Sequence, residues 1–270
     1  MSILWRNYLL SSELLLAFLL LCFIISIVKK RNDIADVAWG LGFLLVAIFS
    51  YYLGGLTADL GLLSTTLVTI WSIRLATHIY LRNKNRDEDP RYKVWREQWG
   101  KWFYPRSFMQ VFLLQGALLL LVISPVVITN TFRVTSIGWV AVLGFTIWLV
   151  GFLFESVGDL QLKRFIKNPN NKGKIMRYGL WRYTRHPNYF GEVTQWWGLW
   201  VIALSSPYGW LGIIGPVTIT ILILKVSGVP LLERQMAKNP EFKDYVSKTS
   251  VFIPLPPKNN NNNNNNSRKK

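Results

Sequence analysis

Long runs of apolar residues, separated by shorter polar loops, dominate the chain. Seven runs are each close to the about 20 residues that a helix needs to cross a bilayer. They are Tyr8 to Val28, Ile34 to Leu53, Leu56 to Tyr80, Phe108 to Thr129, Ser136 to Leu160, Tyr189 to Ser206 and Tyr208 to Gly228. The pattern predicts an all-α, polytopic integral membrane bundle of about seven transmembrane helices, within a range of six to eight. We expect one membrane-embedded domain over residues 1–257.

Basic residues gather in alternate loops between these runs. Of the 31 Lys and Arg residues, 27 lie after the first, third, fifth and seventh runs. Because short cytosolic loops of membrane proteins carry an excess of Lys and Arg, this alternation predicts an amino terminus outside and a carboxyl terminus in the cytosol. A wrong number of helices would have broken the alternation.

Composition supports a membrane protein and limits the partners. The chain of 270 residues is 51% hydrophobic and only 17% charged, which favours a membrane protein over a soluble domain. The net charge of +17 suggests nucleic acid, but the basic residues fall in short loops, so we expect no nucleic-acid partner. The single cysteine, Cys22, excludes a disulfide framework and a zinc cluster, and we interpret it as a packing residue; no metal is expected.

Three regions outside the apolar runs carry further information. The loop from Arg82 to Phe108 mixes both charges with aromatic residues, which is typical of a helix at the membrane interface. The loop from Lys163 to Arg185 contains eight basic residues and several turn-forming ones. It could wrap a polyanionic ligand, although anchoring on the cytosolic side accounts for part of its charge. Residues 258–270 predict a disordered, Asn-rich basic tail.

The segment GLWRYTRHPNYFGEVTQWWGLW, which begins at Gly179, combines an apolar second half with a basic first half. Pro187 has a fixed φ and no amide donor, so it suits the first position of a helix. The free amides of this helix then face the same space as the basic residues before it, an arrangement that holds a phosphate or another anion. Asn188 and Glu192 lie one turn apart on one face. Basic anchoring explains the arginines but not this polar pair.

Ionisable residues within or beside the apolar runs form a second candidate site. Such residues are costly at membrane depth unless they face a polar cavity or a partner. They are Asp36, Arg74, His78, Glu155, Asp159, Glu192 and Lys225. Together they predict a polar chamber that opens to the cytosol within the inner half of the bilayer. The alternative is a set of unrelated ion pairs between helices.

Several of these motifs carry a resemblance to a known family. The run GLWRYTRHPNYFGE, with ESVGDLQL upstream, IADVAWG near the amino end and FIPLPP near the carboxyl end, resembles the steroid 5-alpha-reductase family. The nearest branch contains membrane proteins that share the reductase carboxyl-terminal domain, and residues 155–257 are the most family-like part. The resemblance implies a seven-helix reductase that holds NADPH in a cytosol-facing cavity. It also implies hydride transfer to an activated carbon–carbon double bond of a steroid or similar lipid, taken from the bilayer.

The resemblance also implies roles for single residues. The nicotinamide end of NADPH is expected at Asn188, Tyr189 and Glu192, and the cofactor site is completed by Asp159, Arg164, Arg185 and His186. Basic residues among these are expected near the phosphates. In the family, an acid on the second helix and a tyrosine on the third polarise the substrate carbonyl. The candidates here are Asp36 on the second helix and Arg74 and Tyr80 on the third, where the family's tyrosine has no clear counterpart.

A membrane methyltransferase of the isoprenylcysteine or phospholipid type is the main alternative. Its pattern fits Arg185, His186, Pro187, Tyr189, Gly191 and Glu233, and its cofactor is S-adenosylmethionine. That cofactor is not a polyanion, so it gives no reason for the basic loop; moreover, Leu232 stands where this type has a second glutamate. A non-catalytic lipid-binding protein would need the helices alone. The SRKK end and the resemblance favour the endoplasmic reticulum membrane, and no obligate protein partner is evident.

Overall fold

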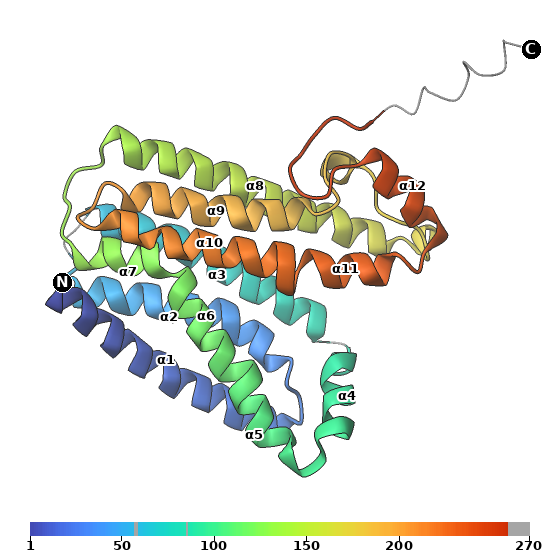
Figure 1. Ribbon diagram of the computed structural model, residues 1–270, viewed down its shortest axis with the longest axis horizontal. Helices are drawn as coiled ribbons and strands as arrows, with labels where there is room; N and C mark the ends of the chain where they lie inside the picture. Colours follow the sequence, from blue (N-terminus) through green and yellow to red (C-terminus); the bar gives the residue numbers. More distant parts are fainter. Residues whose placement is uncertain (57–58, 85, 259–270) are drawn as a thin grey trace, which may run out of the picture. The chain divides into compact units, whose positions relative to one another are not determined.

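The computed structural model describes residues 1–56, 59–84 and 86–258 (Figure 1). Its α-helices are α1 (Ser2–Lys29), α2 (Ile34–Leu53), α3 (Asp59–Asn83), α4 (Pro90–Trp99), α5 (Phe103–Ser107), α6 (Leu114–Val122), α7 (Ser124–Thr131), α8 (Trp139–Lys167), α9 (Pro187–Ala203), α10 (Ile214–Ile221), α11 (Val229–Met236) and α12 (Pro240–Lys248). Two π-helical segments, Phe108–Leu113 and Leu222–Val226, lie between α5 and α6 and between α10 and α11. The predicted disordered tail falls almost wholly on residues 259–270, which lie outside the described residues.

The predicted all-α, polytopic membrane bundle is confirmed. Among the described residues there is no strand, and one isolated parallel bridge joins Thr184 and Ser250. Within the described ranges, six helical stretches are long and apolar enough to cross a membrane: Ser2–Lys29, Ile34–Leu53, Asp59–Asn83, Tyr92–Val122, Trp139–Lys167 and Gly209–Met236. The remaining apolar run forms α9, whose 17 residues span about 26 Å at 1.5 Å per residue, a little less than the hydrocarbon core.

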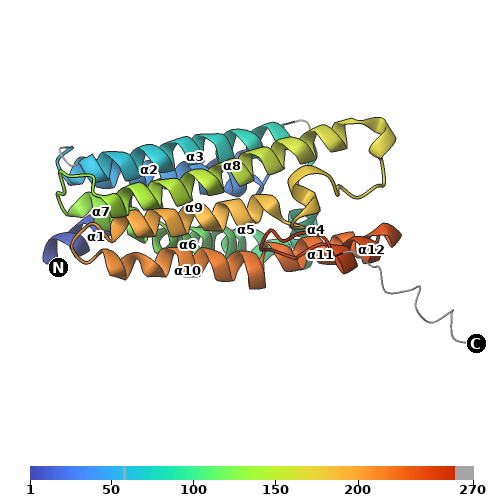
Figure 2. The ribbon, with the colours of Figure 1, turned by 90° about the horizontal axis from the view of Figure 1, so that it is seen from above.

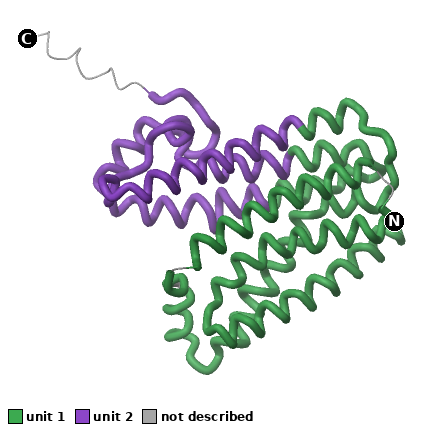
Figure 3. Tube along the Cα trace, turned by 180° about the vertical axis from the view of Figure 1, so that it is seen from behind, with its two compact units in different colours: residues 1–145, 198–218 green, residues 146–197, 219–270 purple. Residues whose placement is uncertain are grey.

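The helices divide into two compact units (Figure 3). Unit 1 contains residues 1–145 and 198–218, and unit 2 contains residues 146–197 and 219–270. The boundaries fall inside α8, α9 and α10, so each of these helices contributes to both units. The prediction of a single domain over residues 1–257 stays a prediction, as does the orientation of the termini.

Unit 1 is built around α1, α2 and α3, with α7 against their ends (Figure 1). Asn130 of α7 is buried, and its amide nitrogen donates hydrogen bonds to Ser50 Oγ at 2.8 Å and Thr65 Oγ1 at 3.0 Å. These bonds tie α7 to α2 and α3, because a buried amide is stable only when it is hydrogen-bonded.

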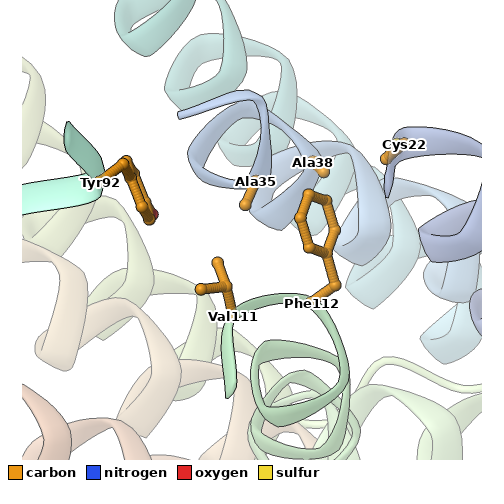
Figure 4. Packing of buried hydrophobic residues seen from close by; sticks show 6 residues of the cluster. All are labelled: Cys22, Ala35, Ala38, Tyr92, Val111 and Phe112. Atoms are coloured by element: carbon orange, nitrogen blue, oxygen red, sulfur yellow. The ribbon is translucent and has the colours of Figure 1, made fainter. Parts of the chain in front are cut away.

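A second part of the unit 1 core lies between α1, α2 and the π-helical segment before α6. Figure 4 shows Val111 and Phe112 directed towards Ala35 and Ala38 of α2. Cys22 of α1 is buried beside them and is a free thiol, as its interpretation as a packing residue predicts. Small residues on α2 leave room for the aromatic ring, so the helices approach closely.

The loop predicted as an interfacial helix contains α4. Trp95 and Trp99 stack with ring centroids 5.0 Å apart, and the Arg96 guanidinium lies 4.1 Å from the centroid of Phe103. Glu88 accepts hydrogen bonds from Arg96 and from the backbone amide of Asn32, so this loop is fastened to the start of α2. A location at the membrane interface stays a prediction.

In unit 2, α8 and α9 run alongside each other, and their backbones are in direct contact (Figure 2). A Cβ atom added to Gly191 of α9 would lie 2.4 Å from the backbone nitrogen of Glu155 and 2.5 Å from the carbonyl oxygen of Gly151. Further along α8, the contact is looser: a Cβ atom added to Gly158 would lie 3.3 Å from the ring of Pro187 and from the backbone nitrogen of Asn188. Small residues let membrane helices pack this closely, and this contact positions the polar residues of both helices.

We predict that Gly191→Ala destabilises the protein, although alanine normally favours a helix over glycine by about 1 kcal/mol. The added methyl group meets backbone atoms that cannot rotate away, and such overpacking costs about 1–3 kcal/mol. The melting temperature in detergent should therefore fall by a few degrees. Gly138→Ala is the control, because nothing lies within 4 Å of its added Cβ. An unchanged melting temperature in Gly191→Ala would contradict the close contact.

Candidate functional site

The residues before α9 form a tight turn that is fixed against α8. Gly179 has a φ of +59°, which favours glycine, and an added Cβ there would meet the amide group of Gln161. Gln161 Oε1 accepts a hydrogen bond from the backbone amide of Leu180 at 3.0 Å. Trp181 Nε1 donates to the carbonyl oxygen of Gly158 at 3.1 Å. The basic segment therefore enters α9 along a defined path, and α9 begins at Pro187 as predicted.

The carboxyl-terminal segment, residues 249–258, returns to this turn. The backbone amide of Arg185 donates to the carbonyl oxygen of Ser250 at 2.9 Å, and the amide of Leu255 donates to that of Tyr183 at 3.0 Å. Thr184 Oγ1 donates to the carbonyl oxygen of Phe252 at 2.8 Å. The turn is thus held between α8 on one side and the carboxyl-terminal segment on the other.

A charged cluster, which we call the Arg–His–Glu cluster, lies at the centre of the turn and consists of Arg185, His186 and Glu233. Arg185 Nε donates to Glu233 Oε1 at 2.7 Å, and His186 Nε2 lies 3.2 Å from the same oxygen. Arg185 Nη1 donates to the carbonyl oxygen of Thr249 at 2.7 Å. Arg185 is 6% exposed and His186 is 1% exposed. Buried charges need partners of this kind, so the cluster fixes α11 against the start of α9.

Burial lowers the pKa of His186, and the hydrogen bond to Glu233 opposes this shift. A lowered pKa favours the neutral imidazole at neutral pH. Because a carboxylate oxygen can only accept a hydrogen bond, the neutral imidazole carries its proton on Nε2 and donates this hydrogen bond to Glu233. His186 Nδ1 is then an acceptor, and it is buried without a hydrogen-bond partner among the described residues. The ring also stacks on Tyr189, with centroids 5.6 Å apart.

Asn188 and Asp159 meet across α9 and α8. Asn188 Nδ2 donates to Asp159 Oδ1 at 3.1 Å. Because a carboxylate only accepts, this bond fixes the orientation of the amide and turns Asn188 Oδ1 away from Asp159. Asn188 Oδ1 is buried and has no partner among the described residues. The bond to Asp159 therefore leaves Asn188 Oδ1 as an acceptor that no described residue uses.

A second polar pair lies further into α8 and α9. Gln195 Nε2 donates to Glu155 Oε2 at 2.6 Å, and Glu155 is 3% exposed. Gln195 also donates to the carbonyl oxygen of Gly191 at 3.3 Å. The structure therefore gives Glu155 a partner that the sequence analysis missed, because Gln195 lies among apolar residues and is not ionisable.

The predicted cofactor residues lie in unit 2 and the predicted substrate residues in unit 1. Glu192 is half-buried on α9, and Arg164 is exposed in the last turn of α8. Asp36 of α2 and Arg74 of α3 are half-buried, and Tyr80 is 52% exposed. The backbones of α2 and α3 approach closely near Gly40 and Ala76. The chamber that would join both groups of residues stays a prediction.

Glu233 is a functional candidate that the reductase prediction did not include. The sequence analysis considered it solely for the methyltransferase alternative, whereas the structure brings it to both Arg185 and His186. Its separation from His186 by 47 residues gives no local signal of this contact. An amphipathic pattern along α11 and α12 is consistent with helices, but it does not say which residues they meet.

Comparisons with known proteins point to one family. The family model described as "Protein of unknown function (DUF1295)" matches residues 22–249. Relatives include 3-oxo-5-alpha-steroid 4-dehydrogenase 1 of Rattus norvegicus, 30% identical over 131 residues, which are 46% of this chain and 47% of the relative. The Homo sapiens protein of the same name is 40% identical over 57 residues, 21% of this chain and 22% of the relative.

A methyltransferase also appears among the relatives. Probable O-methyltransferase ustE of Ustilaginoidea virens is 50% identical over 46 residues, 17% of this chain and 16% of the relative. The chain spans less than half the length of the curated relatives that it matches. No solved structure matches.

We predict that the stability of the protein falls as the pH is lowered through about 6.5, and that His186→Gln weakens this dependence. The pKa of His186 is lowered by folding, so the unfolded chain binds the proton more readily. The stabilisation is therefore present above the unfolded pKa of about 6.5 and is lost as the pH falls towards the folded value. The measurement is the melting temperature in detergent between pH 8 and pH 5. Gly138→Ala should keep the wild-type slope, and an equal slope in His186→Gln would contradict the assignment.

Proposed function

The chain belongs to the DUF1295 family, and from this premise we propose that it is an NADPH-dependent membrane reductase. Its substrate is a steroid or another lipid from the bilayer with an activated carbon–carbon double bond. Two kinds of observation support the proposal: the similarity to proteins named 3-oxo-5-alpha-steroid 4-dehydrogenase, and the arrangement of Asn188 and Asp159. We expect the endoplasmic reticulum as its membrane.

The observation that carries the proposal is the buried acceptor on Asn188. Its amide nitrogen is engaged by Asp159 and its carbonyl oxygen is without a partner among the described residues. A buried acceptor left unpaired is unfavourable by about 1–3 kcal/mol, which a ligand N–H group would recover. The carboxamide of a nicotinamide ring has such a group, so the residues present fit this cofactor. Tyr189 and Glu192 follow on α9 and complete the proposed nicotinamide site.

Basic residues are proposed to hold the phosphates. Arg164 is exposed in the last turn of α8, so its guanidinium is accessible to an anion. In the predicted orientation of the chain in the membrane, this end of α8 faces the cytosol. Arg185 already donates to Glu233 and to the carbonyl oxygen of Thr249. A contact of Arg185 or of His186 with a phosphate stays a prediction. The hydrogen bonds of these two residues to Glu233 give both a further role, which is to position α9.

NADPH, when bound, supplies a hydride. The residues of the chain have to orient the substrate and stabilise the charge that forms on its carbonyl oxygen when the conjugated double bond is reduced. A donor near that oxygen lowers the barrier, and a proton then completes the reduction at the neighbouring carbon. Asp36 in its protonated form, Arg74 and Tyr80 are the proposed donors.

A second candidate function is a methyltransferase that uses S-adenosylmethionine. The Arg–His–Glu cluster supports it, because the contact of Glu233 with Arg185 and His186 joins the parts of that sequence pattern. The similarity to the Ustilaginoidea virens protein over 46 residues supports it as well. The two functions require different cofactors, so binding separates them.

We predict that the purified protein binds NADPH more tightly than S-adenosylmethionine. Titration to about 100 Kd should stabilise the protein by about 2.7 kcal/mol, measured as a rise in melting temperature. Asn188→Ala should weaken NADPH binding by about tenfold or more, because a buried hydrogen bond is lost. Asn170→Ala, an exposed change in the basic loop, should leave the affinity unchanged. Stabilisation by S-adenosylmethionine alone would replace the reductase proposal by the methyltransferase.

We further predict that Asp36→Asn slows enone reduction while leaving NADPH affinity nearly intact. The substitution keeps the volume and a hydrogen-bonding group but removes the titratable acid. If Asp36 belonged only to a structural ion pair, Asp36→Asn would instead lower the stability of the protein, because the charged partner would be left unpaired in a low dielectric. The measurement is single-turnover NADPH oxidation with a panel of enone lipids, beside the melting temperature. A normal rate with every active lipid would exclude Asp36 as the donor and make Tyr80→Phe the next variant.

A further inference from the structure

The carboxyl-terminal segment carries a row of aliphatic side chains on its outer side. It turns back from α12 towards the start of α9 (Figure 1). Val251, Ile253 and Leu255 are 40%, 60% and 53% exposed, and Phe252 and Pro254 between them are half-buried. This alternation has the two-residue period of an extended chain that packs with one side on the protein. The three exposed side chains, which we call the aliphatic row, therefore share one face.

The aliphatic row is held in place by backbone hydrogen bonds on both sides. The carbonyl oxygen of Ser250 accepts one from the amide of Arg185 at 2.9 Å, and the amide of Leu255 donates to the carbonyl oxygen of Tyr183 at 3.0 Å. Single exposed aliphatic residues are common on protein surfaces. Here, the segment cannot turn the row inward without breaking these bonds, so the fold itself keeps three neighbouring aliphatic side chains exposed. A fixed apolar surface of this kind points to an apolar partner.

The half-buried side of the segment connects it to the apolar helices of unit 2. Phe252 packs edge-on against Phe190 of α9, with ring centroids 5.8 Å apart, and Phe190 packs against Phe154 of α8 at 5.1 Å. Phe154 lies within Trp139–Lys167, one of the stretches that can cross a membrane. Its neighbour Leu153 is 51% exposed. A single aromatic ring therefore separates Phe252 from the apolar part of a membrane helix, and the bilayer around this helix is the nearest apolar phase.

The backbone of the segment suits an apolar environment. Pro254, Pro256 and Pro257 have no N–H group. The N–H groups of Leu255 and Lys258 already donate to carbonyl oxygens of unit 2, at 3.0 and 2.9 Å. No N–H between residues 254 and 258, all of which are described, is thus left to be paired, whereas an unpaired N–H in lipid is costly. The same prolines exclude a protein strand as the partner, because strand addition needs free N–H donors along the edge.

We propose that the aliphatic row inserts into the bilayer, at the boundary between the headgroups and the acyl chains, and that phospholipid is its partner. In the predicted orientation this boundary belongs to the cytosolic leaflet. Tyr183 beside the segment is 43% exposed, and Lys258 at its end is exposed. Tyrosine is enriched at this depth, and a lysine can extend its ammonium group to the headgroups. The segment that holds the start of α9 is then part of the membrane-bound surface, whichever cofactor the protein uses.

The experiment places a nitroxide spin label on a single cysteine of the full-length protein in phosphatidylcholine vesicles. Cys22→Ala provides the background, because Cys22 is the one cysteine of the chain. Power saturation measures collisions of the label with oxygen, which dissolves in hydrocarbon, and with a water-soluble nickel chelate, which is excluded from it. The oxygen-to-nickel ratio at Ile253→Cys should be several-fold above that at Asn170→Cys, which is exposed in the basic loop. It should lie within twofold of the ratio at Leu153→Cys, which is exposed on α8.

Leu255→Cys should give the same result as Ile253→Cys, because both side chains belong to the aliphatic row. Each labelled variant should keep the wild-type melting temperature in detergent, as expected for exposed positions. Ratios at both positions equal to that at Asn170→Cys would overturn the proposal and place the segment in water. Low collision rates with both reagents would also overturn it, because protein then covers the row, as in contact with a second copy of the chain.

Discussion

The contact between Arg185 and Glu233 is the constraint on which the polar part of unit 2 depends. A guanidinium that is 6% exposed has lost most of its hydration and must be compensated by hydrogen bonds and an opposite charge. Glu233 supplies the charge and the carbonyl oxygen of Thr249 a further acceptor. These two partners lie on α11 and on the segment after α12, so one side chain connects three parts of the chain. Because α9 begins two residues after Arg185, the same contact holds the start of that helix against α11.

The close approach of α8 and α9 is the second constraint. Gly151 and Gly191 leave no space between the two backbones, so the side chains that flank them meet without a layer of large residues in between. The bonds from Gln195 to Glu155 and from Asn188 to Asp159 both bridge these two helices. In a bilayer, such bonds satisfy polar groups that lipid cannot. The glycines thus determine which polar side chains of the two helices meet.

Much of this arrangement follows from the sequence, and the remainder depends on tertiary contacts. The apolar runs define the membrane helices because length and hydrophobicity act locally, and Pro187 marks the start of α9 because its ring restricts the backbone. The apolar run of this helix extends to Ser206 in the sequence, whereas α9 ends at Ala203 in the structure. The place of Glu233 could not be read from its neighbours, since a carboxylate on an amphipathic helix can face many partners. Gln195 could not be identified from the sequence, because a single uncharged amide beside tryptophans gives no signal of a buried polar contact.

The return of the carboxyl-terminal segment to the start of α9 has a consequence for biosynthesis. Thr184 and Phe252, which its hydroxyl contacts, are 68 residues apart. At a translation rate of 5–20 residues per second, roughly 3 to 14 s pass between the synthesis of these two residues. Glu233 follows Arg185 by 48 residues and Thr249 follows it by 64, so for most of that interval the arginine and the histidine lack their carboxylate partner, and the carbonyl partner of the arginine comes later still. Lipid headgroups and water must solvate both side chains until α11 and the carboxyl-terminal segment have been synthesised.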